Sequence, residues 1–103
     1  MTKQDVLETI LKAVCHCTGI GVQEMSSRQK SKELNTARGV YYLLAHKLGY
    51  KQKDVCQLIG RSRPSCIITT KVYCNYYETK DPLTLRMYSD VRDEYFRIID
   101  SEL

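Results

Sequence analysis

The sequence predicts an all-α fold of five or six helices, on three grounds. Apolar residues recur at helical spacing through most of the 103 residues, and no stretch alternates with period two for long enough to make a convincing sheet. Serine, threonine, aspartate and proline stand where helices would begin, and glycines stand where they would end. The length fits a single domain, residues 1–103, which buries a modest core without a metal or a disulfide.

The first expected helix has its apolar stripe over residues 6–14 and begins at Thr2 or Gln4. The glycines of residues 19–21 end it, because glycine accepts the backbone angles that terminate a helix. A short turn of helix is expected to follow at residues 22–25.

Residues 26–31 contain no apolar side chain and are expected to form a loop. The clearest helix comes next: its apolar residues repeat at three- and four-residue intervals from Leu34 to Leu48, and Gly49 is a candidate C-cap. Residues 53–59 form a short helix with its apolar side chains facing inward.

A further helix begins near Pro64 and runs towards Tyr77, because proline is tolerated in the first turn of a helix. Ser62 or Arg63 caps it, and serine is the better capping residue. The β-branched run at residues 67–70 favours a strand, which is the main alternative to helix in this segment.

Asp81 and Pro82 start a last helix over residues 81–103. Its apolar face comprises Leu85, Tyr88, Val91, Tyr95, Ile98 and Ile99. Two roles are open for it: completing the core, or presenting a surface to a second copy of the chain or to a partner protein.

Positive charge is concentrated in the middle of the chain. Residues 28–80 contain eleven basic and three acidic residues, a net charge of +8, whereas residues 1–27 have a net charge of −1 and residues 81–103 a net charge of −3. A basic block of this kind indicates a polyanionic partner, most often nucleic acid, although a solvated charged face that binds nothing is also common.

The five cysteines are odd in number and show no CxxC spacing. No signal peptide is visible, and no apolar run reaches the roughly 18 residues needed to cross a membrane. Free thiols in a reducing cytoplasm are the simplest interpretation.

The two helices at residues 53–59 and 63–77, joined by a glycine-containing turn, match the helix-turn-helix pattern. In that motif the start of the second helix faces base edges in the major groove. The residues expected to read bases are Ser62, Arg63, Ser65 and Thr69, since arginine pairs with guanine and hydroxyls bond to several bases.

Five basic residues are expected to contact the DNA backbone. Two of them, Arg61 and Lys71, flank the base-reading positions. The other three belong to the preceding loop, where a basic segment can clamp phosphate or enter the minor groove: Arg28, Lys30 and Lys32.

Residues from about 7 to 78 resemble the C-terminal DNA-binding domain of the bacterial replication initiator DnaA. Residues 14–25 look like that family's first helix and the turn after it, and Ser-Arg-Gln-Lys-Ser-Lys at residues 27–32 resembles its basic loop. Ala-Arg-Gly-Val-Tyr-Tyr-Leu-Leu at residues 37–44 looks like its "ARQIAMYL" helix. Asp-Val at residues 54–55 falls where the family has Glu-Ile, and Gly-Arg-Ser-Arg-Pro-Ser-Cys-Ile at residues 60–67 aligns with its signature "GRDHTTVL".

The departures from that signature lie at the base-reading positions. Arg61 keeps the family's arginine, but Ser62 replaces its aspartate, Arg63 its histidine, and Pro64 and Ser65 its two threonines. This changed set implies a different target sequence or a loss of specificity. The turn is also one residue shorter than in the family, with one glycine where the family usually has two.

The resemblance implies a Trp-repressor-like helix-turn-helix bundle over residues 1–80 that binds double-stranded DNA without a cofactor, in replication control or transcription regulation. It also places Lys30 at or near the loop arginine that enters the minor groove. The chain has no P-loop, so the initiator's nucleotide-driven assembly is not expected of it. The alternative is a helical protein-interaction module that keeps the fold without binding DNA.

Other features favour structural roles over chemistry. Cys15, His16 and Cys17 diverge around one helical turn and lack the paired spacing of zinc ligands. No cysteine has an accompanying catalytic pattern, so we expect no enzyme. The tyrosines are expected to fill core edges rather than stack on bases. Arg38 lies beside the apolar stripe of its helix and is expected to bridge elements internally.

Overall fold

The computed structural model describes the backbone of residues 2–102 and the side chains of residues 2–101. Over this range the fold is all-helical, as predicted, and contains six helices. They are α1 (Lys3–Thr18), α2 (Val22–Met25), α3 (Lys32–Lys47), α4 (Gln52–Leu58), α5 (Arg63–Glu78) and α6 (Pro82–Glu102). None of these helices is both long and apolar enough to cross a membrane.

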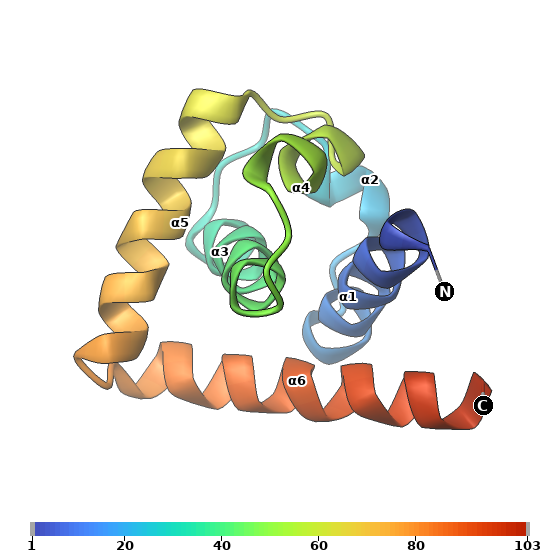
Figure 1. Ribbon diagram of the computed structural model, residues 1–103. Coiled ribbons are helices and arrows are strands. Elements are labelled where there is room, and N and C mark those ends of the chain that lie inside the picture. The colour runs from blue at the N-terminus through green and yellow to red at the C-terminus, as the bar shows by residue number, and fades with distance from the viewer. Residues whose placement is uncertain (1, 103) are drawn as a thin grey trace.

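Helix α3 forms the centre of the bundle and contacts every other helix (Figure 1). Its residues from Ala37 to Ala45 are all buried, so α3 is covered on all sides along its middle. Within it, the Tyr41 hydroxyl donates a 2.8 Å hydrogen bond to the Val55 carbonyl and so ties α3 to α4. The other helices take their positions by packing around this core.

Side-chain caps confirm the predicted starts of α1 and α6. Thr2 accepts a hydrogen bond from the Asp5 backbone, and Asp5 in turn accepts one from the Thr2 backbone, which forms a capping box. Asp81 accepts a 3.0 Å hydrogen bond from the Thr84 backbone at the start of α6. Gly49 follows α3 with a φ of 89°, a left-handed conformation that suits glycine after a helix.

The strand alternative at residues 67–70 is wrong, because this run lies within α5. Cys66 and Thr70 are buried one turn apart, and the Thr70 hydroxyl donates a 2.7 Å hydrogen bond to the Cys66 carbonyl. Burial at helical spacing and a capped start therefore outweigh the strand preference of β-branched residues.

Helix α6 completes the core, since Tyr88, Val91, Tyr95 and Ile98 are buried against the rest of the bundle. The long helix lies across α1 and α3 (Figure 1). Of its three aromatic residues, only Phe96 is exposed. The expectation for the tyrosines is met at seven of the eight positions. Four are buried in the core (Tyr41, Tyr42, Tyr88 and Tyr95), three are partly buried against it (Tyr50, Tyr73 and Tyr77), and Tyr76 is exposed.

Candidate nucleic-acid interface

The amino end of α5 is an exposed helix tip. Ser62 is the N-cap, and its hydroxyl accepts a 3.4 Å hydrogen bond from the Ser65 backbone. Pro64 lies in the first turn, where its missing N–H leaves no donor unpaired. Ser62, Arg63 and Pro64 are all exposed, so this tip is accessible to a partner.

The basic loop beside this tip is organised by one buried arginine. Arg38 is 3% exposed, and its guanidinium donates four hydrogen bonds to backbone carbonyls. The acceptors belong to the end of α2 and the loop: Glu24, Met25, Ser27 and Gln29, at 2.7–3.2 Å. The loop backbone thus wraps around Arg38, as the expected internal role requires, while Arg28 and Lys30 remain exposed.

Arg61 joins the helix-turn-helix to the same loop. Its Nη1 donates a 3.0 Å hydrogen bond to the Ser27 carbonyl, which also accepts the 2.7 Å bond from Arg38. Burial, followed by repulsion from Arg61, lowers the pKa of Arg38. Arginine nevertheless stays protonated, so two positive charges are held close together beneath the loop.

A groove of about 370 Å³ runs between this loop, the start of α3 and the outer side of α5. The described residues that line it include three cations and no carboxylate. They are Lys30, Asn35, Arg38, Tyr42, Arg61, Ser65, Ile68, Thr69, Val72, Tyr73 and Tyr76. A hollow lined only by positive and neutral groups favours an anionic partner.

The groove contains four of the nine residues predicted to contact DNA: Lys30, Arg61, Ser65 and Thr69. Lys32 lies next to it, lining an adjoining hollow that also includes Lys30. Ser62 and Arg63 belong to the exposed helix tip. Arg28 and Lys71 are exposed but do not line the groove, so the structure does not bring them together with the other seven.

The position of α5 against α3 depends on Gly39. A Cβ atom at this position would overlap the ring of Tyr73, so only glycine lets the two helices approach this closely. The Tyr73 hydroxyl also lies 3.4 Å from the Thr36 hydroxyl, a second contact between the same helices. This crossing sets the width of the groove.

No known relative places the chain in a family. Comparisons with protein-family models, with curated proteins and with solved structures find no match. The resemblance to the DnaA domain therefore rests on the residue patterns themselves, and the case for a function rests on the geometry of this surface.

The sequence interpretation missed the apolar part of the groove. Ile68, Val72 and Tyr76 are 65%, 40% and 40% exposed and follow one another at four-residue spacing along α5. The signal was present in the sequence, because these residues fall off the helix face that includes Cys66 and Thr70.

The five cysteines are free thiols. Burial raises the pKa of Cys66 to about 11, and it also raises the pKa values of Cys15, Cys17 and Cys74. Thiols with raised pKa values are poor nucleophiles and poor metal ligands at neutral pH. Among the described residues, no three His, Cys, Asp or Glu side chains are grouped to hold a metal ion.

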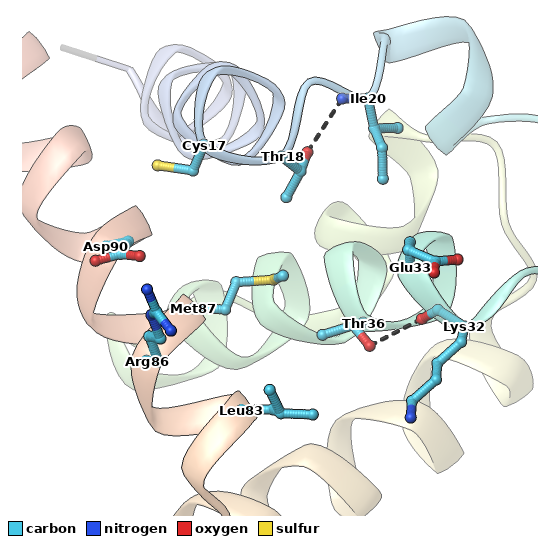
Figure 2. A pocket seen from close by; sticks show the side chains of 10 residues that line it. All are labelled: Cys17, Thr18, Ile20, Lys32, Glu33, Thr36, Leu83, Arg86, Met87 and Asp90. Carbon is cyan, nitrogen blue, oxygen red and sulfur yellow. Dashed lines mark hydrogen bonds between the residues drawn. The ribbon is translucent and has the colours of Figure 1, made fainter.

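A larger hollow, a cleft of about 690 Å³, lies between the end of α1, the start of α3 and the first half of α6 (Figure 2). Its apolar lining comes mainly from Ile20, Leu83 and Met87. Charges of both signs surround it, with Lys32 and Glu33 on α3 and Arg86 and Asp90 on α6.

Proposed function

We propose that the chain binds double-stranded DNA in a sequence-dependent manner through α4, the turn and α5. The observation that supports this most strongly is the groove beside the exposed tip of α5, which is lined by three cations and no carboxylate. A duplex presents phosphates along both edges of a groove wide enough to admit a helix. The exposed tip of α5 can enter that groove of the DNA, while the cations that line the protein groove contact the phosphates at its edges.

The proposed contacts divide by position. The exposed tip and the neighbouring turn of α5 read the major groove through Ser62, Arg63, Ser65 and Thr69. The backbone is held by Arg61 and the basic loop, with Lys30 directed to the minor groove and Arg28, Lys32 and Lys71 to more distant phosphates. Arg61 has a double role, because it also anchors the loop through Ser27.

The biological setting we propose is control of replication or of transcription in the cytoplasm, by a protein that is not an enzyme. Support comes from the resemblance to the DnaA domain and from the free thiols, which suit a reducing compartment. No cofactor is needed for the proposed contacts.

One observation favours a second candidate, a protein-interaction module. Exposed apolar side chains gather near the groove at Ile68, Val72, Tyr76 and Leu83, and such patches often mark protein interfaces. In this case the charged groups beside the patch would select an acidic partner. A second copy of the chain, docking through α6, belongs to the same class of function.

Selection of duplexes from a random library separates the two candidates. We expect enrichment of a defined site, with an affinity that falls with salt at a log–log slope of about −0.9 per phosphate neutralised. Arg63→Ala should relax base preference at one position by about 1–3 kcal/mol, because it removes a base contact.

The matched control is Lys12→Ala, which removes one exposed charge from α1, away from the groove. It should leave the selected sequence and the affinity unchanged. Selection that returned no enriched site and no salt-sensitive retention would reject DNA binding and favour the interaction module.

A further inference from the structure

The most exposed large apolar side chain in the described part of the molecule lies on the proposed DNA-reading helix. Ile68 is 65% exposed, one turn after Ser65 and next to Thr69, and it lines the cationic groove together with both. Single exposed apolar residues are common on protein surfaces. Ile68 differs because Val72 and Tyr76 extend it into a stripe along the same helix.

The surroundings of Ile68 define the chemistry of its partner. The groove supplies positive charge from Lys30 and Arg61, hydroxyls from Ser65 and Thr69, and an apolar surface from Ile68. A matching partner is anionic and presents small apolar groups among hydrogen-bonding atoms. The major groove of DNA has this pattern at thymine, where the C5-methyl group stands beside the O4 acceptor.

The position of Ile68 along α5 fits such a contact. A recognition helix uses its first turns to reach base edges, and Ile68 is the sixth residue of α5. Its side chain points away from the helix face on which Cys66 and Thr70 are buried, so it needs no rearrangement to meet a base. Val72 and Tyr76 lie one and two turns further from the tip.

We propose that Ile68 selects thymine by packing against its methyl group in the major groove. This inference rests on the proposed DNA binding and deepens it, because it names the base that an apolar residue of α5 recognises. A serine or threonine hydroxyl bonds to several bases, whereas a methyl contact distinguishes thymine from the other three.

The test uses the full chain and the duplex obtained by selection. Each thymine in turn is replaced by deoxyuridine, which removes only the methyl group, and the Kd is measured for the wild type and for Ile68→Ala. We expect one position at which the substitution weakens wild-type binding about fourfold, the value of one buried methyl-sized group, and does not weaken binding by the variant.

Two further variants make the result specific. Phe96→Ala removes an exposed apolar side chain from α6, outside the groove, and should keep the full deoxyuridine penalty. Ile68→Thr keeps the branched shape and one methyl group, and should keep part of the penalty. Circular dichroism should show both Ile68 variants to be folded, since the native side chain is mostly exposed.

The outcomes separate the inference from the function on which it rests. Absence of any salt-sensitive duplex binding would overturn both. Tight binding to a selected site that contains no thymine in the major groove under α5 would overturn the methyl contact alone. Equal deoxyuridine penalties for the wild type and Ile68→Ala at every position would also overturn the methyl contact. In both of these cases the proposed DNA binding would stand.

Discussion

Two of the hollows beside the first half of α3, the groove against α5 and the cleft against α6, differ in charge as well as in size. The groove against α5 has a volume of about 370 Å³ and is lined by cations without a carboxylate. The cleft against α6 is nearly twice as large, about 690 Å³, but its two cations, Lys32 and Arg86, are matched by Glu33 and Asp90. Volume alone would select the cleft as the binding site.

The physical difference lies in how far each set of charges acts. Opposite charges within the cleft cancel one another, so its field is weak even within the Debye length of about 8 Å at physiological salt. In the groove the charges add, and Arg38 contributes although it is buried, because its bonding partners are neutral carbonyls. The comparison favours the groove over the cleft as the proposed site for a polyanion, because its charges are not cancelled by carboxylates.

The largest effect we predict comes from the arginine on which the groove is built. Arg38→Met should lower the free energy of unfolding by about 2–4 kcal/mol, because the carbonyls around it lose charged donors. It should also weaken DNA binding, because the loop that presents Lys30 loses its anchor. Chemical denaturation measures the first effect, and a duplex-binding titration measures the second.

Arg86→Met is the matched control, since Arg86 is an exposed arginine that lines the cleft. We expect it to change the unfolding free energy by less than about 0.5 kcal/mol. Equal stability changes in the two variants would show that Arg38 does not organise the loop.

A smaller effect, the loss of DNA affinity when one cation is removed, should distinguish the groove from the cleft. Lys30→Ala should weaken duplex binding and reduce the log–log salt slope by about 1, because one cation close to the DNA phosphates is lost. Arg86→Ala removes the same charge from the cleft and should change neither quantity. Both quantities are measured by titrating each variant with duplex at several salt concentrations. A larger loss of affinity for Arg86→Ala than for Lys30→Ala would indicate that DNA binds at the cleft.

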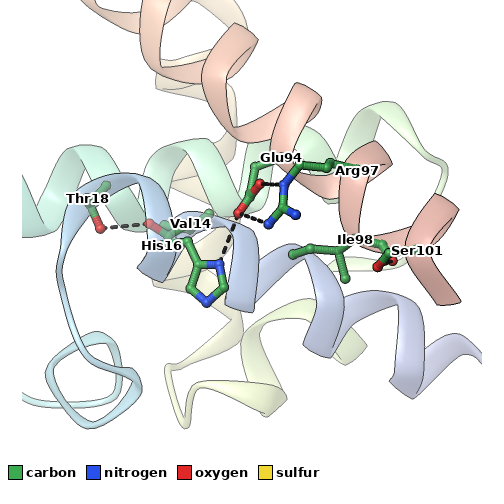
Figure 3. A network of polar contacts seen from close by, with 7 residues as sticks. All are labelled: Val14, His16, Thr18, Glu94, Arg97, Ile98 and Ser101. Atoms are coloured by element: carbon green, nitrogen blue, oxygen red, sulfur yellow. Dashed lines mark hydrogen bonds and ion pairs between the residues drawn. The ribbon is translucent and has the colours of Figure 1, made fainter.

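The smallest effect concerns the contact that joins α1 and α6 next to the cleft (Figure 3). Glu94 accepts a 2.9 Å hydrogen bond from Arg97 and lies 3.0 Å from His16 Nδ1. Bonds from Arg97 and then His16 lower the pKa of Glu94 to about 2. The three side chains connect positions 78 residues apart in the sequence.

Glu94→Gln should lower the melting temperature at pH 7 by no more than about 2 °C, because exposed ion pairs contribute little. A depressed carboxyl pKa stabilises the fold above its ordinary value of 4.5, and this contribution falls as the pH drops towards 2. Melting curves of wild type and variant should therefore converge at acid pH. A difference at pH 2 as large as that at pH 7 would contradict this assignment.

Local signals were sufficient to predict most of the helices. Capping residues at Thr2, Ser62 and Asp81 place helix starts correctly, because a side chain that accepts from a backbone three residues ahead acts within one turn. The short α4 runs over Gln52–Leu58 instead of residues 53–59, an offset of one residue at each end. Helix ends depend on weak terminal hydrogen bonds, so such offsets are ordinary.

The members of the groove were harder to predict than the helices. Lys30 and Thr69 are 39 positions apart and Lys71 is close to Thr69 in sequence, yet only the first two share the groove. Neighbouring residues on a helix point in different directions, and distant ones meet only after packing. Sequence spacing therefore predicted segments that line the groove, but it could not predict which side chains within them face it.

The sequence by itself determined the helices, the position of the turn and the concentration of positive charge in residues 28–80, because caps, apolar periodicity and charge are local properties. Only the tertiary structure decided which charges remain uncancelled on one surface. The approach of α5 to Gly39 and the wrapping of the loop around Arg38 bring distant cations together while leaving carboxylates elsewhere. The sign of the electrostatic potential at a surface depends on that packing, because each charge contributes according to its distance in space and not its separation along the chain.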